Sequence, residues 1–196
     1  MLTAMRPADS IPQSFAFLPD NRRIAPFLLG FHTTYAAYIW IETILYFGSH
    51  VFTDRQFPYL VSLVDAVTKL NPQFYPAYEF AGVIIPRYTD SPDAARVILN
   101  RGINHVSTQR AYKLAFYLGW LYYNHYQDYA LAGEYLALAA SHPKAPPYLA
   151  GLAARAYTNA GERQTAVQFL RYLYDATENP SVRYAISEKL TGMLKD

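Results

Sequence analysis

Residues 118–135 have the sequence LGWLYYNHYQDYALAGEY and place Gly119 inside an apolar stretch that otherwise favours a helix. A glycine within a helix costs about 1 kcal/mol relative to alanine, so a helix that keeps one usually needs a bend or a close contact there. The tyrosines of this stretch combine an apolar ring with a polar tip, which suits a partly buried surface. The stretch therefore predicts closely packed helices with an aromatic, interface-like surface.

Composition narrows the class of protein. The 196 residues are enough for one domain with a sizeable core, and 52% hydrophobic against 16% charged residues excludes a disordered chain. A net charge of +2, with Arg22-Arg23 as the only adjacent basic pair, argues against a nucleic-acid partner. The absence of cysteine excludes disulfides, thiolate metal sites and a cysteine nucleophile, and it fits a cytoplasmic or an envelope location equally.

Helix start and stop signals recur along the chain. Thr53, with Gln56 three residues later, has the pattern of a capping box and predicts a helix over 54–70. Ser91 and Pro92 predict another helix start, with serine at the cap and proline at the first helical position. No alternating strand pattern of useful length occurs, so the sequence predicts an all-α fold of about nine helices joined by short loops.

The predicted helices form pairs, and the pairs repeat. In the second helix of each pair, one position is followed four residues later by a large apolar residue. A small residue occupies this position in every pair except the first. These positions are Leu60, Ala95, Ala132 and Ala166, which gives steps of 35, 37 and 34 residues. Leu118, Gly119 and Tyr122 add a Leu-Gly-x-x-Tyr element in the first helix of the third pair. A fixed period of this length is typical of a helical-repeat array.

Over residues 54–180 the chain resembles the tetratricopeptide repeat (TPR) proteins, with about three recognisable units and a degenerate first one. The resemblance implies a right-handed superhelix of antiparallel helix pairs, a TPR-like α-solenoid, with a C-terminal capping helix over 181–194. The chain departs from the family where Ala115 and Phe116 replace the expected tryptophan and where residues 124–129 lengthen the unit. Other helical-pair solenoids remain an alternative. We expect residues 1–22 to be an irregular lead-in and residues 23–196 to form a single domain.

In the TPR family, the first helices of the pairs line a concave groove that binds an extended or helical peptide. The resemblance implies the following groove residues: Lys113, Phe116, Trp120, Tyr123, Asn124, Tyr148, Arg155, Asn159 and Arg87, with Glu79, Val83 and Thr158 beside them. Trp, Tyr and Arg dominate interface energies, and Arg with Asn can hold a carboxylate. The family's full carboxylate clamp is not reproduced, so its specificity is not carried over. Alternatively, Trp120 and Tyr123 pack against the neighbouring unit.

Motifs for chemistry are absent from the sequence. The histidines form no zinc-binding helix pair, the glycines do not match a phosphate-binding loop, and no Gly-x-Ser-x-Gly element occurs. We therefore predict no catalytic residues, no cofactor and no metal. The expected role is a scaffold or adaptor that binds a protein or peptide partner within a larger assembly.

One segment allows a second hypothesis. Residues 24–41 carry no charged side chain, and this uncharged segment has about the length of a membrane-span candidate. Pro26 and His32 argue against a span. We expect this segment to be the buried first helix of the array. The alternative is an envelope component anchored in a membrane through residues 24–47. Self-association through the aromatic faces is a third hypothesis.

Overall fold

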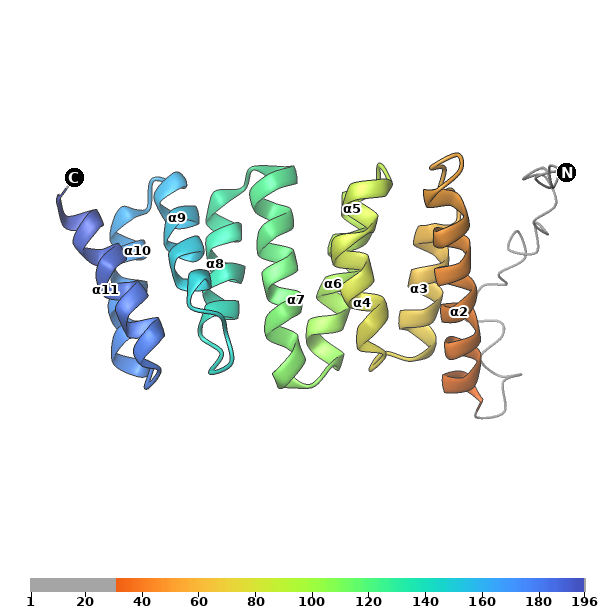
Figure 1. The fold of residues 1–196 in the computed structure, drawn as a ribbon, viewed down its shortest axis with the longest axis horizontal. Helices are drawn as coiled ribbons and strands as arrows, with labels where there is room; N and C mark the ends of the chain where they lie inside the picture. Colours follow the sequence, from red (N-terminus) through yellow and green to blue (C-terminus); the bar gives the residue numbers. More distant parts are fainter. Residues whose placement is uncertain (1–30, 196) are drawn as a thin grey trace, which may run out of the picture. The chain divides into compact units, whose positions relative to one another are not determined.

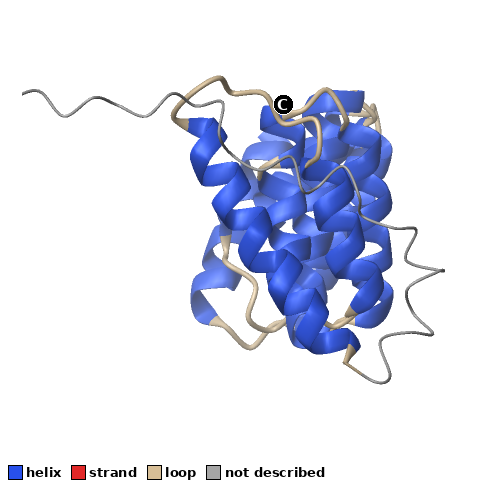
Figure 2. Ribbon diagram, turned by 90° about the vertical axis from the view of Figure 1, so that its right-hand side faces the viewer, coloured by secondary structure: helices blue, strands red, loops and turns tan. Residues whose placement is uncertain are grey.

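The computed structural model describes residues 31–195, and over this range the regular elements are helices and none is a strand (Figure 2). The all-α prediction is therefore confirmed for the described residues. The chain divides into two compact units, Met1–Asn71 and Pro72–Asp196. The predicted lead-in over residues 1–22 lies outside the described residues, and the single domain over 23–196 stays a prediction.

In the first unit the structure describes two helices that pack against each other, α2 (His32–Val51) and α3 (Leu60–Leu70). Their buried side chains include Ala36, Ile39, Thr43 and Tyr46 of α2 and Leu60, Leu63, Val64 and Val67 of α3. Residues 24–30 of the predicted first helix lie outside the described residues. None of the described helices combines the length and the hydropathy needed to cross a membrane.

The predicted helix start at Thr53 is wrong. Helix α3 begins at Leu60, and the Thr53 hydroxyl instead donates to the Ser49 carbonyl in the last turn of α2, at 2.8 Å. The cause is the packing of the connection, because the Phe57 ring is buried against Phe47 with ring centroids 5.3 Å apart. The residues before Leu60 therefore fold into a turn and not into a helix.

The second unit contains the longer run of helices. They are α4 (Tyr75–Val83), the short α5 (Ile85–Tyr88), α6 (Pro92–His105), α7 (Thr108–Leu121), α8 (Tyr129–Ala140), α9 (Tyr148–Asn159), α10 (Arg163–Ala176) and α11 (Pro180–Lys195). The predicted start at Ser91 and Pro92 is confirmed. From α6 onward each helix packs against the next one, while α4 also contacts α7 and α9 also contacts α11 (Figure 1). Helices α4, α7, α9 and α11 thus alternate with α6, α8 and α10.

Gly119 allows α7 and α8 to approach closely. A Cβ atom at this position would lie 2.6 Å from Cγ of Leu136 and 3.1 Å from its backbone nitrogen, which leaves no space for a side chain. The close packing that a glycine inside this helix predicts is confirmed, and the neighbour of Gly119 is Leu136 of the facing helix. Gly133 repeats the arrangement between α8 and α9, since a Cβ there would lie 2.7 Å from the Tyr157 ring.

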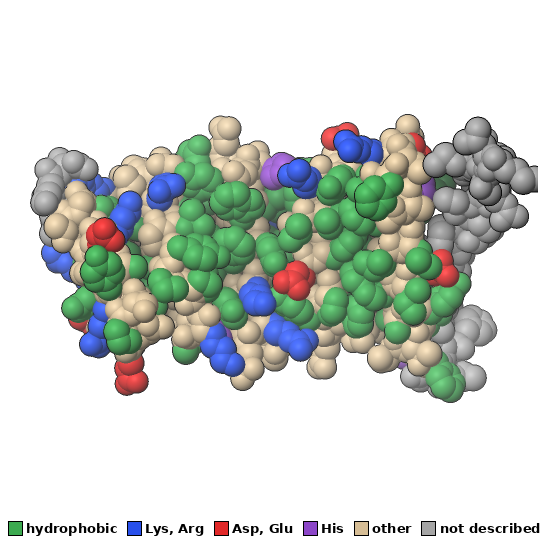
Figure 3. Space-filling view, in the orientation of Figure 1, with side chains coloured by type: hydrophobic (Ala, Val, Ile, Leu, Met, Phe, Trp, Pro, Cys, Tyr) green, Lys and Arg blue, Asp and Glu red, His purple; other side chains and the backbone are tan. Residues whose placement is uncertain are grey.

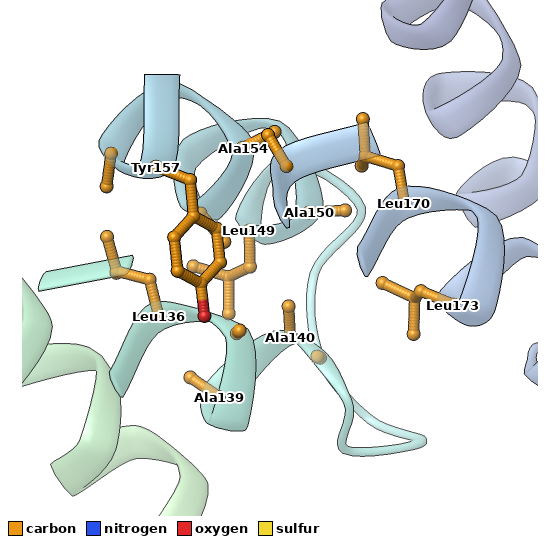
Figure 4. Close-up of a cluster of buried hydrophobic side chains, with 14 of the residues drawn as sticks. Leu136, Ala139, Ala140, Leu149, Ala150, Ala154, Tyr157, Leu170 and Leu173 are labelled. Carbon is orange, nitrogen blue, oxygen red and sulfur yellow. The ribbon is translucent and has the colours of Figure 1, made fainter. Parts of the chain in front are cut away.

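The core of this region consists largely of alanine. Around Leu136, Leu149 and Leu170, the alanines of α8 and α9 face one another, and the Tyr157 ring lies against them (Figure 4). Small side chains on both helices bring the backbones close together, and the larger leucines fill the space between the turns. Ala132 and Ala166, the small positions of the predicted repeat, are completely buried.

Helix α7 continues into a π-helical turn, η4 (Tyr122–Tyr126). The turn ends at Gln127, whose φ of 54° lies in the left-handed region. Asp128 then caps α8, and its carboxylate accepts the Leu131 N–H at 3.0 Å. The residues that lengthen this unit relative to the TPR pattern are thus accommodated in the π-turn and the α8 cap. Single π-turns are frequent at functional sites.

Helix α11 buries one stripe of the predicted C-terminal helix. Val182 and Ile186 are buried, whereas Arg183, Ser187 and Glu188 are exposed, as the sequence pattern indicates. The helix contacts both α9 and α10.

Candidate functional site

A row of aromatic side chains follows the exposed side of α7 and η4. Trp120 lies between Phe116 and Tyr123, with ring centroids 6.4 Å away on both sides, and its plane is tilted only 10° from that of Tyr123. Tyr123 continues the row by an edge contact with Tyr129 at 5.2 Å. Trp120 is 47% exposed although it follows the buried Leu118 and Gly119 in the sequence. We call Phe116, Trp120 and Tyr123 the aromatic row.

A cleft of about 400 Å³ lies beside Trp120, between α4–α5 and α7, and we call it the Trp120 cleft. It is lined by Gly82, Val83, Pro86, Arg87, Phe116, Tyr117, Trp120, Leu121 and His125. In the space-filling view, hydrophobic side chains gather over α7 and the helices beside it (Figure 3). The exposed Arg87 guanidinium lies 5.8 Å from the centroid of the Tyr88 ring. The cleft is therefore mainly apolar, with basic groups among its lining residues.

A second, smaller cleft of about 170 Å³ lies where α4, α7 and the start of α9 meet, and we call it the Glu79 cleft. Its lining residues are Glu79, Tyr112, Lys113, Phe116, Tyr117, Pro146, Tyr148 and Leu149. Phe116 and Tyr117 line both clefts. The two clefts are therefore neighbours on the same side of α7, separated by this pair of rings.

Glu79 and two tyrosines form a polar group in this region. The Tyr117 hydroxyl donates to Oε1 of Glu79 at 3.1 Å. Burial, and then the neighbouring Glu79 carboxylate, raise the pKa of Tyr117 to about 12. The same two causes raise the pKa of Tyr75, one turn before Glu79. Both hydroxyls therefore keep their protons at neutral pH, and Tyr117 orients the carboxylate as a hydrogen-bond donor.

Most of the predicted groove residues meet on this side of the second unit. Of these residues, the Trp120 cleft is lined by Val83, Arg87, Phe116 and Trp120. The Glu79 cleft is lined by Glu79, Lys113, Phe116 and Tyr148. Asn159 of α9 donates to the Tyr123 hydroxyl at 2.8 Å, which joins α9 to the aromatic row. Asn124 is exposed, and its amide donates to the Trp120 carbonyl at 2.9 Å.

Arg155 and Thr158 stand apart from both clefts. Each is exposed on α9, and the Thr158 hydroxyl donates to the Ala154 carbonyl at 2.8 Å. The lining residues that the sequence analysis missed include Pro86, Tyr112, Tyr117 and His125. The predicted repeat assigns one residue per helical turn to the groove. These four residues are sequence neighbours of the assigned ones or belong to the π-turn. The combination of Glu79 with Tyr117, 38 residues later, gave no sequence signal, because only the packing of α4 on α7 brings them together.

Two further hollows adjoin α9. One of about 490 Å³ lies at the connection between α8 and α9, which carries Pro143, Pro146 and Pro147, and the other, of about 390 Å³, lies between α9 and α11. Within residues 31–195, no group of three His, Asp or Glu side chains is arranged to hold a metal ion. No family model, curated protein or solved structure matches the chain.

Proposed function

We propose that the chain is a non-catalytic scaffold or adaptor that binds a peptide or helix of a larger assembly along α4, α7 and α9. The groove consists of the Trp120 cleft, the aromatic row and the Glu79 cleft. No cofactor takes part in this function. The observation that carries the proposal is Trp120, a large aromatic side chain that is 47% exposed beside a cleft of about 400 Å³.

The residue types of this surface support a protein partner. A half-exposed tryptophan between two aromatic rings supplies contact area that is already ordered, so little side-chain entropy is lost on binding. Arg87 and Lys113 line its two clefts as exposed donors. An apolar centre with charged residues around it is the usual composition of an interface.

The proposal includes the finer fold, a right-handed TPR-like superhelix closed by α11 as capping helix. It is supported by the alternation of α4, α7, α9 and α11 with α6, α8 and α10. It is also supported by the complete burial of Ala95, Ala132 and Ala166, the residues that define the repeat period. In a solenoid, such small positions allow the second helix of each pair to approach the first.

Site-specific photo-crosslinking in the native host tests the groove. Trp120 is replaced by p-benzoylphenylalanine in the full chain, and the crosslinked partner is identified by mass spectrometry. Val97 of α6 and Leu138 of α8 are matched controls, because they are apolar and similarly exposed, at 51% and 56%, but belong to the other set of helices. We expect a discrete crosslinked product from position 120 and not from the controls. Equal crosslinking from all three positions, or none from position 120, would contradict the proposal.

One observation supports the alternative, a membrane-attached envelope component. Helix α2 exposes Tyr38, Ile41 and Leu45 at spacings of three and four residues, and Phe52 directly after its end is also exposed. A helix with one apolar side can lie in a membrane interface without crossing it. Flotation with liposomes tests this role, and the double variant Ile41→Ser, Leu45→Ser should abolish any binding that depends on α2. Sedimentation of the same two chains tests self-association, which the double variant should also weaken if α2 mediates it.

A further inference from the structure

The Glu79 cleft surrounds one carboxylate with aromatic rings. Tyr112, Phe116 and Tyr117 of α7 and Tyr148 of α9 line it, and Glu79 of α4 contributes the carboxylate. The cleft is thus assembled from three helices of the second unit. Its rings are held in place by neighbours, since Tyr112 stacks on His142 at 4.3 Å and Phe116 contacts Tyr117 at 5.5 Å.

We propose that the Glu79 cleft binds a cationic side chain of the partner, either a lysine, a methylated lysine or an arginine. The inference rests on the proposed scaffold function, because it specifies what the partner presents to the groove. A ring face attracts a cation through its quadrupole, and several rings around one cation form an aromatic cage. The Glu79 carboxylate adds a direct charge partner, which a cage for an uncharged side chain would not need.

The position of Glu79 fits this role. Its Oε1 accepts the Tyr117 hydroxyl, which fixes the carboxylate at the wall of the cleft. A carboxylate has about four acceptor positions, so Glu79 keeps capacity for an ammonium or guanidinium group even with the hydroxyls of Tyr117 and Tyr75 beside it. A neutral apolar side chain would instead cover a charged group without pairing it, which is unfavourable.

The chain already uses its tyrosine rings in this way. Arg110 lies over the Tyr75 ring at 5.2 Å from the centroid, one turn of α7 from the Glu79 cleft. Arg87 lies over Tyr88 at 5.8 Å, and Arg183 lies over Tyr174 at 5.7 Å. These contacts are intramolecular, whereas the aromatic residues of the Glu79 cleft line an open space.

The size of the cleft indicates a single side chain as occupant. At about 170 Å³ it is smaller than the roughly 300–1,000 Å³ of typical small-molecule sites. The neighbouring Trp120 cleft is more than twice as large, at about 400 Å³. A partner segment that crosses Phe116 and Tyr117 can therefore place an apolar residue in the larger cleft and a cationic residue in the smaller one.

Lys113 is the group that opposes a cation in this cleft. It lines the cleft but is exposed, and among residues 31–195 no ion pair joins it to Glu79. A long lysine side chain can keep its ammonium group in water while its stem covers the rings. If the inference is right, Lys113 lowers the affinity for a cation, and its removal should raise that affinity.

Amino-acid probes with matched shapes test the charge preference. The full chain is titrated with the N-acetyl methylamides of lysine, trimethyl-lysine, arginine and the uncharged norleucine, and binding is followed by amide NMR shifts. We expect at least one cationic probe to bind about tenfold more tightly than norleucine, with shifts centred on Glu79, Tyr117 and Tyr148. The tightest of the three cationic probes identifies the side chain.

Three variants complete the experiment. Glu79→Gln should reduce the tenfold preference to about threefold or less, whereas the same change at the exposed Glu134 of α8 should leave it unaltered. Lys113→Gln should strengthen cation binding. Equal binding of norleucine and all cationic probes, shifts that lie away from the cleft, or an unchanged preference in Glu79→Gln would overturn the inference.

The outcome is separable from that of the scaffold proposal. If Trp120 crosslinks to a partner segment without lysine or arginine, the cage is contradicted and the scaffold function stands. If the cationic probes bind selectively but position 120 gives no crosslink, the scaffold function is contradicted and the charge preference of the cleft stands.

Discussion

The two sides of α7 differ in the size of side chain that they can accommodate. On the side toward α8, Gly119 is in a contact so tight that an added Cβ would meet Leu136 at 2.6 Å. On the groove side, the next residue is Trp120, which is 47% exposed beside an open cleft. Adjacent residues of one helix thus serve the fold and the surface separately. Substitutions on the two sides should therefore have separable effects on stability and on binding.

The largest effect on stability is expected for Gly119→Leu. The new side chain would collide with the side chain and the backbone nitrogen of Leu136, so α7 and α8 would have to move apart. We expect a loss of about 3 kcal/mol in the free energy of unfolding, at the upper end of the overpacking range. Denaturant unfolding followed by circular dichroism measures it. A loss below about 0.5 kcal/mol would contradict the close packing of α7 on α8.

Ala132→Leu tests the neighbouring turn. Ala132 is fully buried, so a leucine there must displace neighbouring side chains, whereas a side chain at Gly119 also meets the backbone nitrogen of Leu136. A loss of about 1–3 kcal/mol is expected. Unfolding curves of the two variants should therefore rank Gly119→Leu as the more destabilised chain.

Trp120→Ala should weaken partner binding more than it lowers stability, the reverse of the effect expected at Gly119. We expect the affinity for the crosslinked partner to fall by about 2 kcal/mol, or thirtyfold, while the free energy of unfolding falls by about 1 kcal/mol or less. Titration calorimetry with the partner and denaturant unfolding measure the two quantities on the same preparation. If the unfolding free energy instead drops by about 3–5 kcal/mol, Trp120 belongs to the core and not to a binding surface.

The sequence predicted the fold class and several helix ends because these depend on local chemistry. Proline at residue 92 cannot continue a preceding helix and suits the first turn of a new one, so that start was predictable. Thr53 has an equally good local signal, but the burial of Phe57 against Phe47 overrode it. A capping pattern indicates the local conformational preference of a short segment, and tertiary packing can override that preference.

The candidate site was only partly predictable for the same reason. The repeat register pointed to Trp120, Tyr123 and Lys113 because a helix has a fixed period. It could not reveal the π-turn of η4, or that the Tyr117 hydroxyl meets Glu79 of another helix. The contact between Tyr117 and Glu79 depends on the packing of α4 against α7, which no single helix encodes.

Tyr117→Phe should have a smaller effect that depends on pH. Burial and Glu79 raise the pKa of Tyr117 from 10.0 to about 12, so the folded chain keeps this proton where the unfolded chain loses it. The contribution of Tyr117 to stability is therefore fully present below pH 10 and is lost as the pH rises towards 12. We expect the variant to have a flatter decline of stability over this range than the unsubstituted chain. Parallel declines in unfolding experiments between pH 9 and about 11.5 would contradict the shift in the Tyr117 pKa.

The smallest effect, and the one with the opposite sign, is expected at Gly151. This glycine lies inside α9, lines the hollow beside α11, and an added Cβ would meet no atom within 4 Å. Without a steric cost, the change Gly151→Ala only removes backbone freedom from the unfolded chain. It should stabilise the protein by about 0.5–1 kcal/mol. The identical change Gly119→Ala should destabilise it, because there the same methyl group lies 2.6 Å from Leu136. Unfolding midpoints that shift in the same direction for both variants would contradict either the close contact at Gly119 or the open space at Gly151, since both changes add one methyl group to a helix and differ only in what surrounds it.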